Sequence, residues 1–330
     1  MKNNKLLWIR IAVVVVVIAV IVVTALVSQS SYKDKTIKIG ATEVLTGNAA
    51  YYGESSRKGI DLGIDWLKKE YPDMNFEVVH EDNQFNPKTA IDAYNKLMFI
   101  NKVDAIITQN SPASVAIEPL AQRDGILQMG ISASALKYST PDDLSFRMTA
   151  SAEFEVKPII EYIAQNHKKV AIMYMNNEVG VSQSSSLEKG LIEKKITVTM
   201  NEGFPVESND FRTILARIKT DNPDVIYIAG LASHITAALK QTKDLGISTQ
   251  IITFRTGDDP LLISESKGLA EGVIFSSNFD PSSSNSEVQQ FVSEYENKYE
   301  ILPDGYAAEG YEGTKFVGKV LVKCGRDYVC

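Results

Sequence analysis

Positive charge, histidine and cysteine are all scarce in this sequence. Its 330 residues carry a formal net charge of −7 at pH 7, and no lysine or arginine cluster occurs beyond the extreme N-terminus. Without a basic surface, a nucleic-acid-binding role has no electrostatic support. The three histidines, His80, His167 and His234, are isolated from one another in the sequence. They therefore do not form a motif with the spacing of a metal site.

The motifs of common enzyme chemistries are absent as well. The sequence has no glycine-rich dinucleotide fingerprint, no P-loop and no His-Glu-x-x-His motif. Residues 130–134 (Gly-Ile-Ser-Ala-Ser) resemble a nucleophile elbow but lack its final glycine, and no histidine partner is evident. Asp258 and Asp259 are more typical of a helix cap than of a catalytic pair. We therefore expect a protein that is not an enzyme and that uses no cofactor or metal.

The only long hydrophobic run lies at the N-terminus. Lys2, Lys5 and Arg10 precede residues 11–27, which are apolar except for Thr24. With the apolar residues before Arg10, the segment approaches the roughly 20 residues that span a bilayer. Positive charge on its N-terminal side predicts that the rest of the chain is exported. We expect a single-pass membrane anchor with a tether, over residues 1–35; a cleaved signal peptide is the alternative.

The two cysteines, Cys324 and Cys330, lie close together near the end of the sequence. Export to an oxidising compartment would permit a disulfide between them. We predict this disulfide, which would close a tight loop over residues 325–329. Two free thiols are the alternative.

A small-residue β-α-β unit is the most informative stretch that the sequence does contain. Residues 105–108 form a short β-branched run, after which Ser111 suits the N-cap of a helix and Pro112 suits its first helical position. A second strand ends in the polar turn 130–134. Ligands of open α/β sheets bind at the carboxyl ends of strands, and a helix N-terminus attracts a carboxylate. The unit thus favours a small-anion site, although an ordinary loop has the same composition.

Strand and helix patterns alternate along the whole chain after residue 35, and the pattern restarts after residue 150. This alternation predicts an α/β protein with parallel sheets in two Rossmann-like lobes. We expect residues 36–150 with 279–323 to form the first lobe. Residues 151–278 with 324–330 are expected to form the second.

Several short segments, in this order, resemble the branched-chain amino acid (Leu/Ile/Val) binding proteins of ABC transporters. The resemblance runs from about residue 37 to residue 322. The segments that carry it are Ile37-Lys38-Ile39-Gly40, Leu45-Thr46-Gly47, Tyr52-Gly53, Val103-Asp104-Ala105-Ile106-Ile107, Ser111, Gly125-Ile126-Leu127, Ser132-Ala133-Ser134, Phe146-Arg147, Asn209-Asp210-Phe211, Asn222-Pro223-Asp224-Val225-Ile226, Leu269-Ala270-Glu271-Gly272 and Tyr306 to Gly313. It implies the type I periplasmic-binding-protein fold, with three crossovers between the lobes and hinge closure around a ligand.

The resemblance also implies a set of ligand-binding residues. In that family the ligand carboxylate binds a serine side chain and backbone N–H groups, which fall here on Ser111, Ala133 and Ser134. An aromatic wall falls on Tyr52, and an acidic residue after the lobe crossover falls on Glu153.

Three positions depart from the family pattern. Two aromatic positions of the second lobe fall on Val179 and Leu231. The acidic residue that receives the ligand's amino group falls on Arg255, an inversion of charge. The ligand therefore need not be a plain branched-chain amino acid.

We therefore expect an extracytoplasmic solute-binding protein of an ABC importer. Its partners would be an amino acid, amide or small carboxylate, an ABC permease and the membrane that holds the N-terminal helix. The alternative is the sensor ectodomain of a signalling receptor, because the same fold serves both roles. Only about ten residues precede the apolar segment, which argues against a one-chain sensor. Family members usually continue beyond the position of Cys330, so this chain is expected to be short at its C-terminus.

Overall fold

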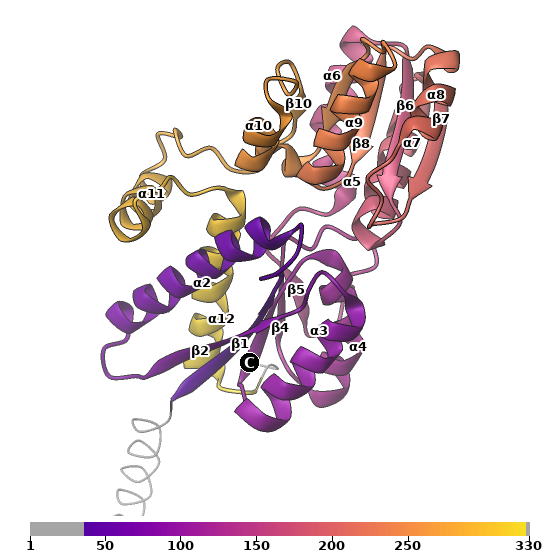
Figure 1. Ribbon diagram of the computed structural model, residues 1–330. Coiled ribbons are helices and arrows are strands. Elements are labelled where there is room, and N and C mark those ends of the chain that lie inside the picture. Colours follow the sequence, from indigo (N-terminus) through magenta and orange to yellow (C-terminus); the bar gives the residue numbers. More distant parts are fainter. Residues whose placement is uncertain (1–35, 328–330) are drawn as a thin grey trace, which may run out of the picture.

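The computed structural model describes residues 36–327 and contains two α/β lobes, one above the other in Figure 1. The first lobe is built on a five-stranded sheet with strand order β2-β1-β3-β4-β5, and every neighbouring pair is parallel. Its strands are β1 (Ile37–Glu43), β2 (Phe76–Asp82), β3 (Ala105–Gln109), β4 (Gln128–Ile131) and β5 (Ser145–Arg147). Its helices are α2 (Ala50–Glu70), α3 (Pro87–Asn95), η1 (Lys96–Asn101), α4 (Ser111–Asp124), α11 (Ser286–Tyr299) and α12 (Gly305–Cys324).

The second lobe repeats this architecture with a sheet in the order β10-β9-β8-β6-β7, also parallel throughout. Its strands are β6 (Lys169–Met175), β7 (Thr197–Phe204), β8 (Val225–Ala229), β9 (Gln250–Thr253) and β10 (Ile274–Phe275). Its helices are α5 (Ala152–Glu155), α6 (Lys157–Asn166), α7 (Glu178–Glu193), α8 (Arg212–Asp221), α9 (Ala232–Asp244), η2 (Arg255–Asp258) and α10 (Pro260–Ser266). The predicted α/β fold with two Rossmann-like lobes is confirmed.

The central strand of each lobe is buried along its whole length because helices cover both faces of its sheet. All five residues of β3 are buried, and so are all five residues of β8. This burial explains why β8 is a continuous hydrophobic run and why β3 starts as one before the buried polar residues Thr108 and Gln109 at its carboxyl end.

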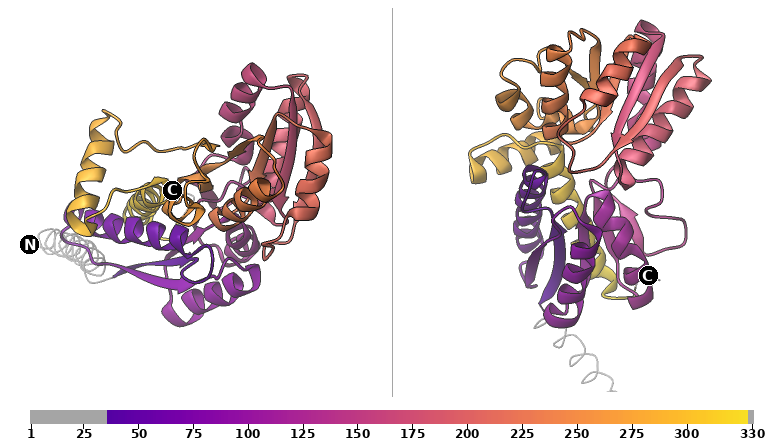
Figure 2. Two further views of the ribbon diagram at one scale, coloured as in Figure 1. Left: turned by 45° about the horizontal axis from the view of Figure 1, so that its top comes forward. Right: turned by 45° about the vertical axis from the view of Figure 1, so that its right-hand side comes forward.

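Helix α12 returns the chain to the first lobe, where it packs against α2 over most of its length (Figures 1 and 2). Gly59 of α2 and Gly310 of α12 allow the close approach, because a Cβ on either would collide with backbone of the opposite helix. The start of α12 lies next to the second lobe, so its first turns can contribute side chains to the junction between the lobes (Figure 1).

The described residues cross between the lobes twice, between β5 and α5 and again between β10 and α11. Just beyond α12, Arg326 contacts the first lobe: its Nε donates to Asp104 Oδ1 (3.0 Å) and its Nη2 donates to the Val103 carbonyl (2.7 Å). The sequence prediction assigned residues 324–330 to the second lobe. The described part of that segment instead contacts the first.

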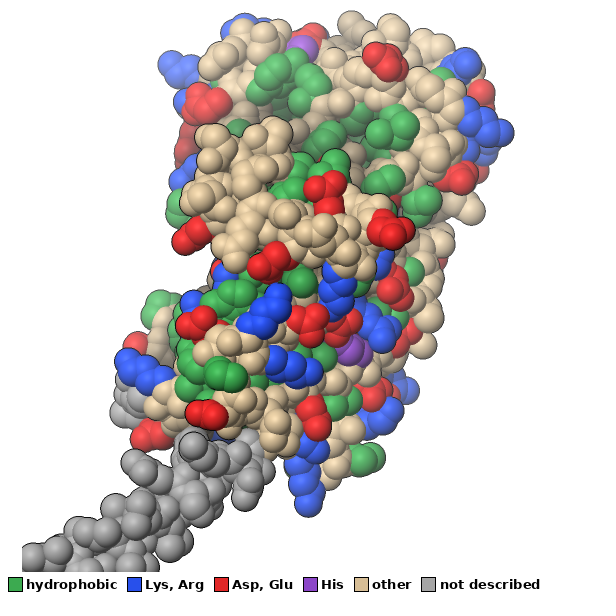
Figure 3. All heavy atoms as spheres, turned by 90° about the vertical axis from the view of Figure 1, so that its left-hand side faces the viewer, with side chains coloured by type: hydrophobic (Ala, Val, Ile, Leu, Met, Phe, Trp, Pro, Cys, Tyr) green, Lys and Arg blue, Asp and Glu red, His purple; other side chains and the backbone are tan. Residues whose placement is uncertain are grey.

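Two further expectations fall outside the described residues. The anchor and tether lie within residues 1–35, and Cys330, the partner of Cys324 in the predicted disulfide, lies within residues 328–330. None of the helices found between residues 36 and 327 is both long enough and apolar enough to span a membrane. On the face drawn in Figure 3, acidic and basic side chains are interspersed over the first lobe and its junction with the second.

Candidate functional site

A small cavity lies between the two lobes, at the carboxyl ends of strands from both sheets. Its volume is about 40 Å³, far below the roughly 300–1,000 Å³ of typical ligand pockets. The first lobe contributes Tyr52, Phe85, Gln109, Asn110, Ser111, Ser132, Ser134 and Tyr306. The second lobe contributes Met175, Val179, Leu231, Phe254, Arg255 and Thr256. The lobes are therefore in contact around this cavity, and a larger guest can enter only if they separate.

The loop after β3 forms the polar part of the first-lobe wall. Asn110 has φ 77° and ψ 153°, and its side-chain oxygen accepts from the Ala113 N–H (2.9 Å), so Asn110 is the N-cap of α4. The sequence prediction gave the capping role to Ser111, which is instead the first helical residue. Both residue types are good caps, and the backbone turn at Asn110 decides between them. As a result, the Ser111 hydroxyl is not used in capping.

The loop after β4 lies beside the start of α4. The Ala135 N–H donates to Ser111 Oγ (3.1 Å), which ties the two loops together and leaves the Ser111 hydroxyl proton available as a donor. Ser134 is buried and also lines the cavity. Two serine hydroxyls and the N-terminal turn of α4 therefore converge on one side of the cavity, where the helix dipole favours an anion.

Two tyrosines whose rings are tilted against each other form part of the aromatic wall. The ring centroids of Tyr52 and Tyr306 lie 4.9 Å apart. The Tyr52 hydroxyl accepts from the Ala232 N–H of the second lobe (3.1 Å), so it bridges the lobes. Burial raises the pKa of both tyrosines well above the usual range, which keeps the two phenols neutral at physiological pH.

The second-lobe wall is apolar apart from Thr256 and Arg255. Met175 and Val179 come from the end of β6 and the start of α7, and Leu231 precedes α9. Val179 and Leu231 occupy positions where the resembled family has aromatic side chains, so this wall presents aliphatic carbons instead.

Arg255 is buried and directs its guanidinium across the junction to the first lobe. Its Nη1 donates to Thr149 Oγ1 (2.7 Å) and Glu309 Oε1 (2.7 Å), and its Nη2 donates to Ser132 Oγ (2.8 Å) and Glu309 Oε2 (3.0 Å). The guanidinium carbon also lies 4.3 Å from the ring centroid of Tyr306. This is a bidentate ion pair between the lobes, which is the strongest geometry for arginine and a carboxylate.

Glu309, on the first turns of α12, is the partner that neutralises Arg255. It also accepts from the Ser132 N–H (2.8 Å), the Ser132 hydroxyl (2.9 Å) and Asn278 Nδ2 (2.6 Å). Burial opposes its ionisation, but the Arg255 charge and these hydrogen bonds outweigh burial and lower the pKa of Glu309. Both members of the pair are therefore charged at neutral pH.

A second carboxylate, Glu155, lies on the other side of Arg255. Its Oε1 is 3.7 Å from Arg255 Nη1, and its Oε2 accepts from Gln183 Nε2. Burial raises the pKa of Glu155, and the nearby Glu309 charge adds to the rise, although the Arg255 charge and hydrogen bonding with Ser134 and Gln183 oppose it. Glu155 is not among the residues that line the cavity.

The structure brings together six of the eight residues that the sequence suggested for ligand binding: Tyr52, Ser111, Ser134, Val179, Leu231 and Arg255. Ala133 is buried and does not line the cavity, although its carbonyl accepts from Arg147. Glu153 is exposed and lines a different surface pocket. The acidic residue of this crossover that approaches Arg255 is Glu155, because residues two apart in a helix point in nearly opposite directions.

Sequence reasoning missed Glu309. The available signal was an acidic residue among the small and aromatic residues of the resemblance segment from Tyr306 to Gly313, since a glutamate on the buried side of a helix requires a partner.

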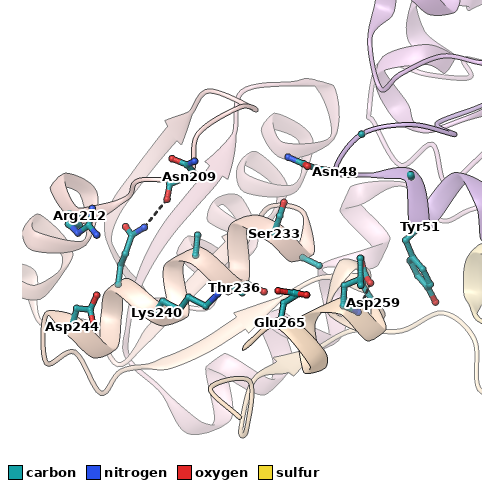
Figure 4. Close-up of a pocket in the computed structure, with 16 residues that line it drawn as sticks. Asn48, Tyr51, Asn209, Arg212, Ser233, Thr236, Lys240, Asp244, Asp259 and Glu265 are labelled. Atoms are coloured by element: carbon teal, nitrogen blue, oxygen red, sulfur yellow. Dashed lines mark hydrogen bonds between the residues drawn. The ribbon is translucent and has the colours of Figure 1, made fainter. Parts of the chain in front are cut away.

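A wider pocket of about 710 Å³ adjoins the small cavity. Figure 4 shows it over α9 and α10, with Asn48 and Tyr51 of the first lobe at one end and Arg212 at the other. Ala232 lines this pocket and donates its N–H to Tyr52, which lines the small cavity. The Tyr52–Ala232 contact therefore lies between the two spaces.

The two lobes, their parallel sheets and the shared cavity define a two-lobed solute-binding architecture. Residues 36–329 match the family model described as "Periplasmic binding protein", and the chain belongs to this family. Members of the family are solute-binding proteins rather than enzymes.

Relatives with named ligands are distant. The chain is 24% identical to "Leu/Ile/Val-binding protein homolog 2" of Brucella abortus over 302 residues, which cover 88% of this chain and 79% of that protein. It is 23% identical to the Leu/Ile/Val-binding protein of Escherichia coli over 221 residues, which cover 66% of this chain and 60% of that protein.

Solved structures share the fold at similar distance. The leucine-binding protein LivK of Thermotoga maritima superposes with a TM-score of 0.78 at 24% identity, covering 88% of this chain and 83% of that one. A solute-binding protein of Rhodopseudomonas palustris in complex with benzoate gives a TM-score of 0.79 at 20% identity, covering 89% and 82%.

Proposed function

We propose that this protein is the extracytoplasmic solute-binding protein of an ABC importer and that it binds an amino acid, an amide or a related small carboxylate between its lobes. The observation that carries this proposal is the cavity between the lobes, where the hydroxyl-bearing wall with Ser111 and Ser134 faces the largely apolar wall of the second lobe. A small molecule with one polar end and one apolar end is complementary to such a site.

Ligand entry would proceed by separation and closure of the lobes. The cavity is too small for an amino acid as it stands, and the two crossovers are short segments that can act as hinges. In the closed form the Arg255–Glu309 pair and the Tyr52–Ala232 hydrogen bond would hold the lobes together.

Ser111 and Ser134 would bind the ligand's carboxylate, with Tyr52 beside it and with Val179 and Leu231 against the apolar end. Arg255 would shape the cavity rather than pair with the ligand, because Glu309 neutralises its charge. The Leu/Ile/Val-binding relatives and the benzoate complex support a small carboxylate as the ligand class.

The N-terminal apolar segment would hold the binding lobes at the outer face of the cell membrane, where an ABC permease receives the ligand. Uptake of labelled ligand by cells that lack the protein, with and without the full-length gene restored, tests this role. Uptake that is restored with the gene supports this role, and equal uptake with and without the gene contradicts it.

A thermal-shift screen of the full-length protein tests ligand binding directly. The panel contains amino acids, amides and small carboxylates. A ligand at 100 times its dissociation constant stabilises the folded state by about 2.7 kcal/mol, so a true ligand raises the melting temperature by several degrees. A panel in which no compound shifts the melting temperature would contradict the proposed ligand class.

A further inference from the structure

The described residues that line the cavity between the lobes include one positive side chain and no negative one. Among the residues of the described chain that line it, Arg255 alone has a charged side chain, and none is an aspartate or a glutamate. An ammonium group enclosed in this cavity would therefore have no carboxylate in the wall beside it. A buried charge without a partner is strongly disfavoured, because the protein does not replace the hydration that the charge loses.

Two carboxylates outside the wall, Glu309 and Asp304, are already engaged with protein donors. Glu309 accepts from both terminal nitrogens of Arg255, from Ser132 and from Asn278. Asp304 accepts from the Tyr51 hydroxyl and the Ser55 hydroxyl and caps α12. Diverting Glu309 to a ligand would break the ion pair between the lobes, and diverting Asp304 would break the hydrogen bonds that join the start of α12 to α2.

Glu155 has one oxygen, Oε1, with no hydrogen-bond partner among the described residues, so it is the strongest alternative receptor for an ammonium group. This oxygen faces Arg255 Nη1 at 3.7 Å, and the carboxyl group does not line the cavity. Burial raises the pKa of Glu155, which further weakens it as a permanent negative charge. Glu155 therefore lies behind the wall, near Arg255 and Ser134, and does not itself face a guest in the cavity.

The remaining features of the cavity suit the opposite charge. Ser111 is the first residue of α4 and Ser134 lies in the loop after β4, and both line the cavity where hydroxyl donors and the helix dipole favour a carboxylate. Apart from Thr256, the rest of the second-lobe wall is aliphatic or aromatic around Arg255. A ligand with one anionic end and an uncharged remainder leaves no group without a partner.

We propose, resting on the solute-binding function above, that the protein selects small monocarboxylates that lack an ammonium group. Their carboxylate binds at Ser111 and Ser134, and their uncharged carbon skeleton packs against Val179, Leu231 and Phe254. Arg255 stands where the resembled family has an acidic residue, and it is paired with Glu309. The described residues that line the cleft therefore offer no carboxylate that could receive the ammonium group of a ligand.

Matched pairs of ligands that differ only in the ammonium group test this inference on the full-length wild-type protein. Calorimetry compares L-leucine with 4-methylpentanoate, and L-phenylalanine with 3-phenylpropanoate. In at least one of these two pairs, we expect the compound without the ammonium group to bind at least about 100-fold more tightly than the amino acid, given the penalty for an unpaired buried ion. Benzamide beside benzoate tests the anionic end, and benzoate should bind more tightly.

The outcomes separate this inference from the function on which it rests. If L-leucine binds as tightly as 4-methylpentanoate or more tightly, the inference is overturned while the solute-binding function stands. If no amino acid, amide or carboxylate binds, both are overturned.

Two glutamine variants identify the reason for either result. Glu155→Gln changes the buried carboxylate, and Glu153→Gln changes an exposed one in the same short helix. We expect both variants to keep the preference for the carboxylate without an ammonium group. Leucine binding that is lost only in Glu155→Gln would assign the ammonium group to Glu155 and overturn the inference.

Discussion

The two walls of the cleft differ in chemistry and in how their side chains are held. The first-lobe wall presents hydroxyl groups from the loops after β3 and β4, and the Ser111–Ala135 hydrogen bond ties these loops together. The second-lobe wall is apolar except for Thr256 and Arg255, and the charge of Arg255 is neutralised by Glu309 of the first lobe. The difference supports our proposal that one lobe recognises the polar end of a ligand and that the other covers its apolar end.

The largest effect is expected when Arg255 loses its partner. Glu309→Gln leaves a buried arginine beside Glu155 alone, and breaking a buried ion pair typically costs about 3–5 kcal/mol of stability. Urea unfolding measures the loss. Glu312→Gln is the matched control, because Glu312 lies on the same helix with a half-exposed side chain paired to Lys315; it should cost less than about 1 kcal/mol.

Replacing both members of the pair sharpens the same point. The double variant Arg255→Met, Glu309→Leu removes both charges, and we expect it to recover most of the stability lost in Glu309→Gln. A double variant as unstable as the single one would contradict the view that an unpaired buried charge causes the loss.

A charged network in the first lobe, away from the cleft, should affect stability but not ligand selection. His80 contacts Glu43 Oε1 (2.5 Å) and Asp61 Oδ1 (3.1 Å). Burial opposes protonation of His80, but the two carboxylates outweigh burial and raise its pKa to about 9. Because the folded pKa exceeds the unfolded value near 6.5, this stabilisation is complete below pH 6.5 and is lost as pH rises through about 9.

Unfolding measured between pH 6 and pH 10 checks this expectation, with a contribution of up to about 3 kcal/mol from the shift. His80→Gln should flatten the profile in that window. A variant with the same pH dependence as the wild type would assign the effect to another group.

Ser111→Ala should weaken ligand binding by about 1.5–3 kcal/mol, the range for a hydrogen bond to a charged group. Calorimetry with the best carboxylate of the screen provides the measurement. Ser185→Ala, at an exposed position of α7, is the control and should leave affinity unchanged. Equal affinity in the two variants would remove Ser111 from the site.

The smallest effect is expected at the contact between the lobes near the wider pocket. Tyr52→Phe removes the acceptor for the Ala232 N–H while it keeps the ring against Tyr306. Loss of this hydrogen bond should weaken binding by about 0.5–1.5 kcal/mol, mainly through faster dissociation. Stopped-flow dissociation measures it, and an unchanged off-rate would show that the contact does not hold the lobes closed.

The first-lobe wall could be predicted from the sequence because its serines directly follow segments that are recognisable as buried strands. Ser111 and Ser134 follow buried strands, and parallel strands bring their carboxyl ends to one edge. The sequence did not determine the N-cap of α4, since Asn110 and Ser111 are both suitable residue types and only the positive φ of Asn110 distinguishes them.

The second-lobe wall could be predicted only in part. Arg255 and Glu309 are 54 residues apart in sequence and lie on different lobes, so their pairing depends on how the lobes meet. The choice between Glu153 and Glu155 required the orientation of a four-residue helix, which no periodic pattern determines.

Hydrogen–deuterium exchange with and without the best ligand tests the central claim, that the ligand is enclosed between the two walls. The account predicts simultaneous protection of residues 110–114 and 131–135 of the first lobe and of residues 175–180 and 254–256 of the second. Protection of one lobe alone, or protection confined to residues 236–244 and 259–265 around the wider pocket, would contradict it.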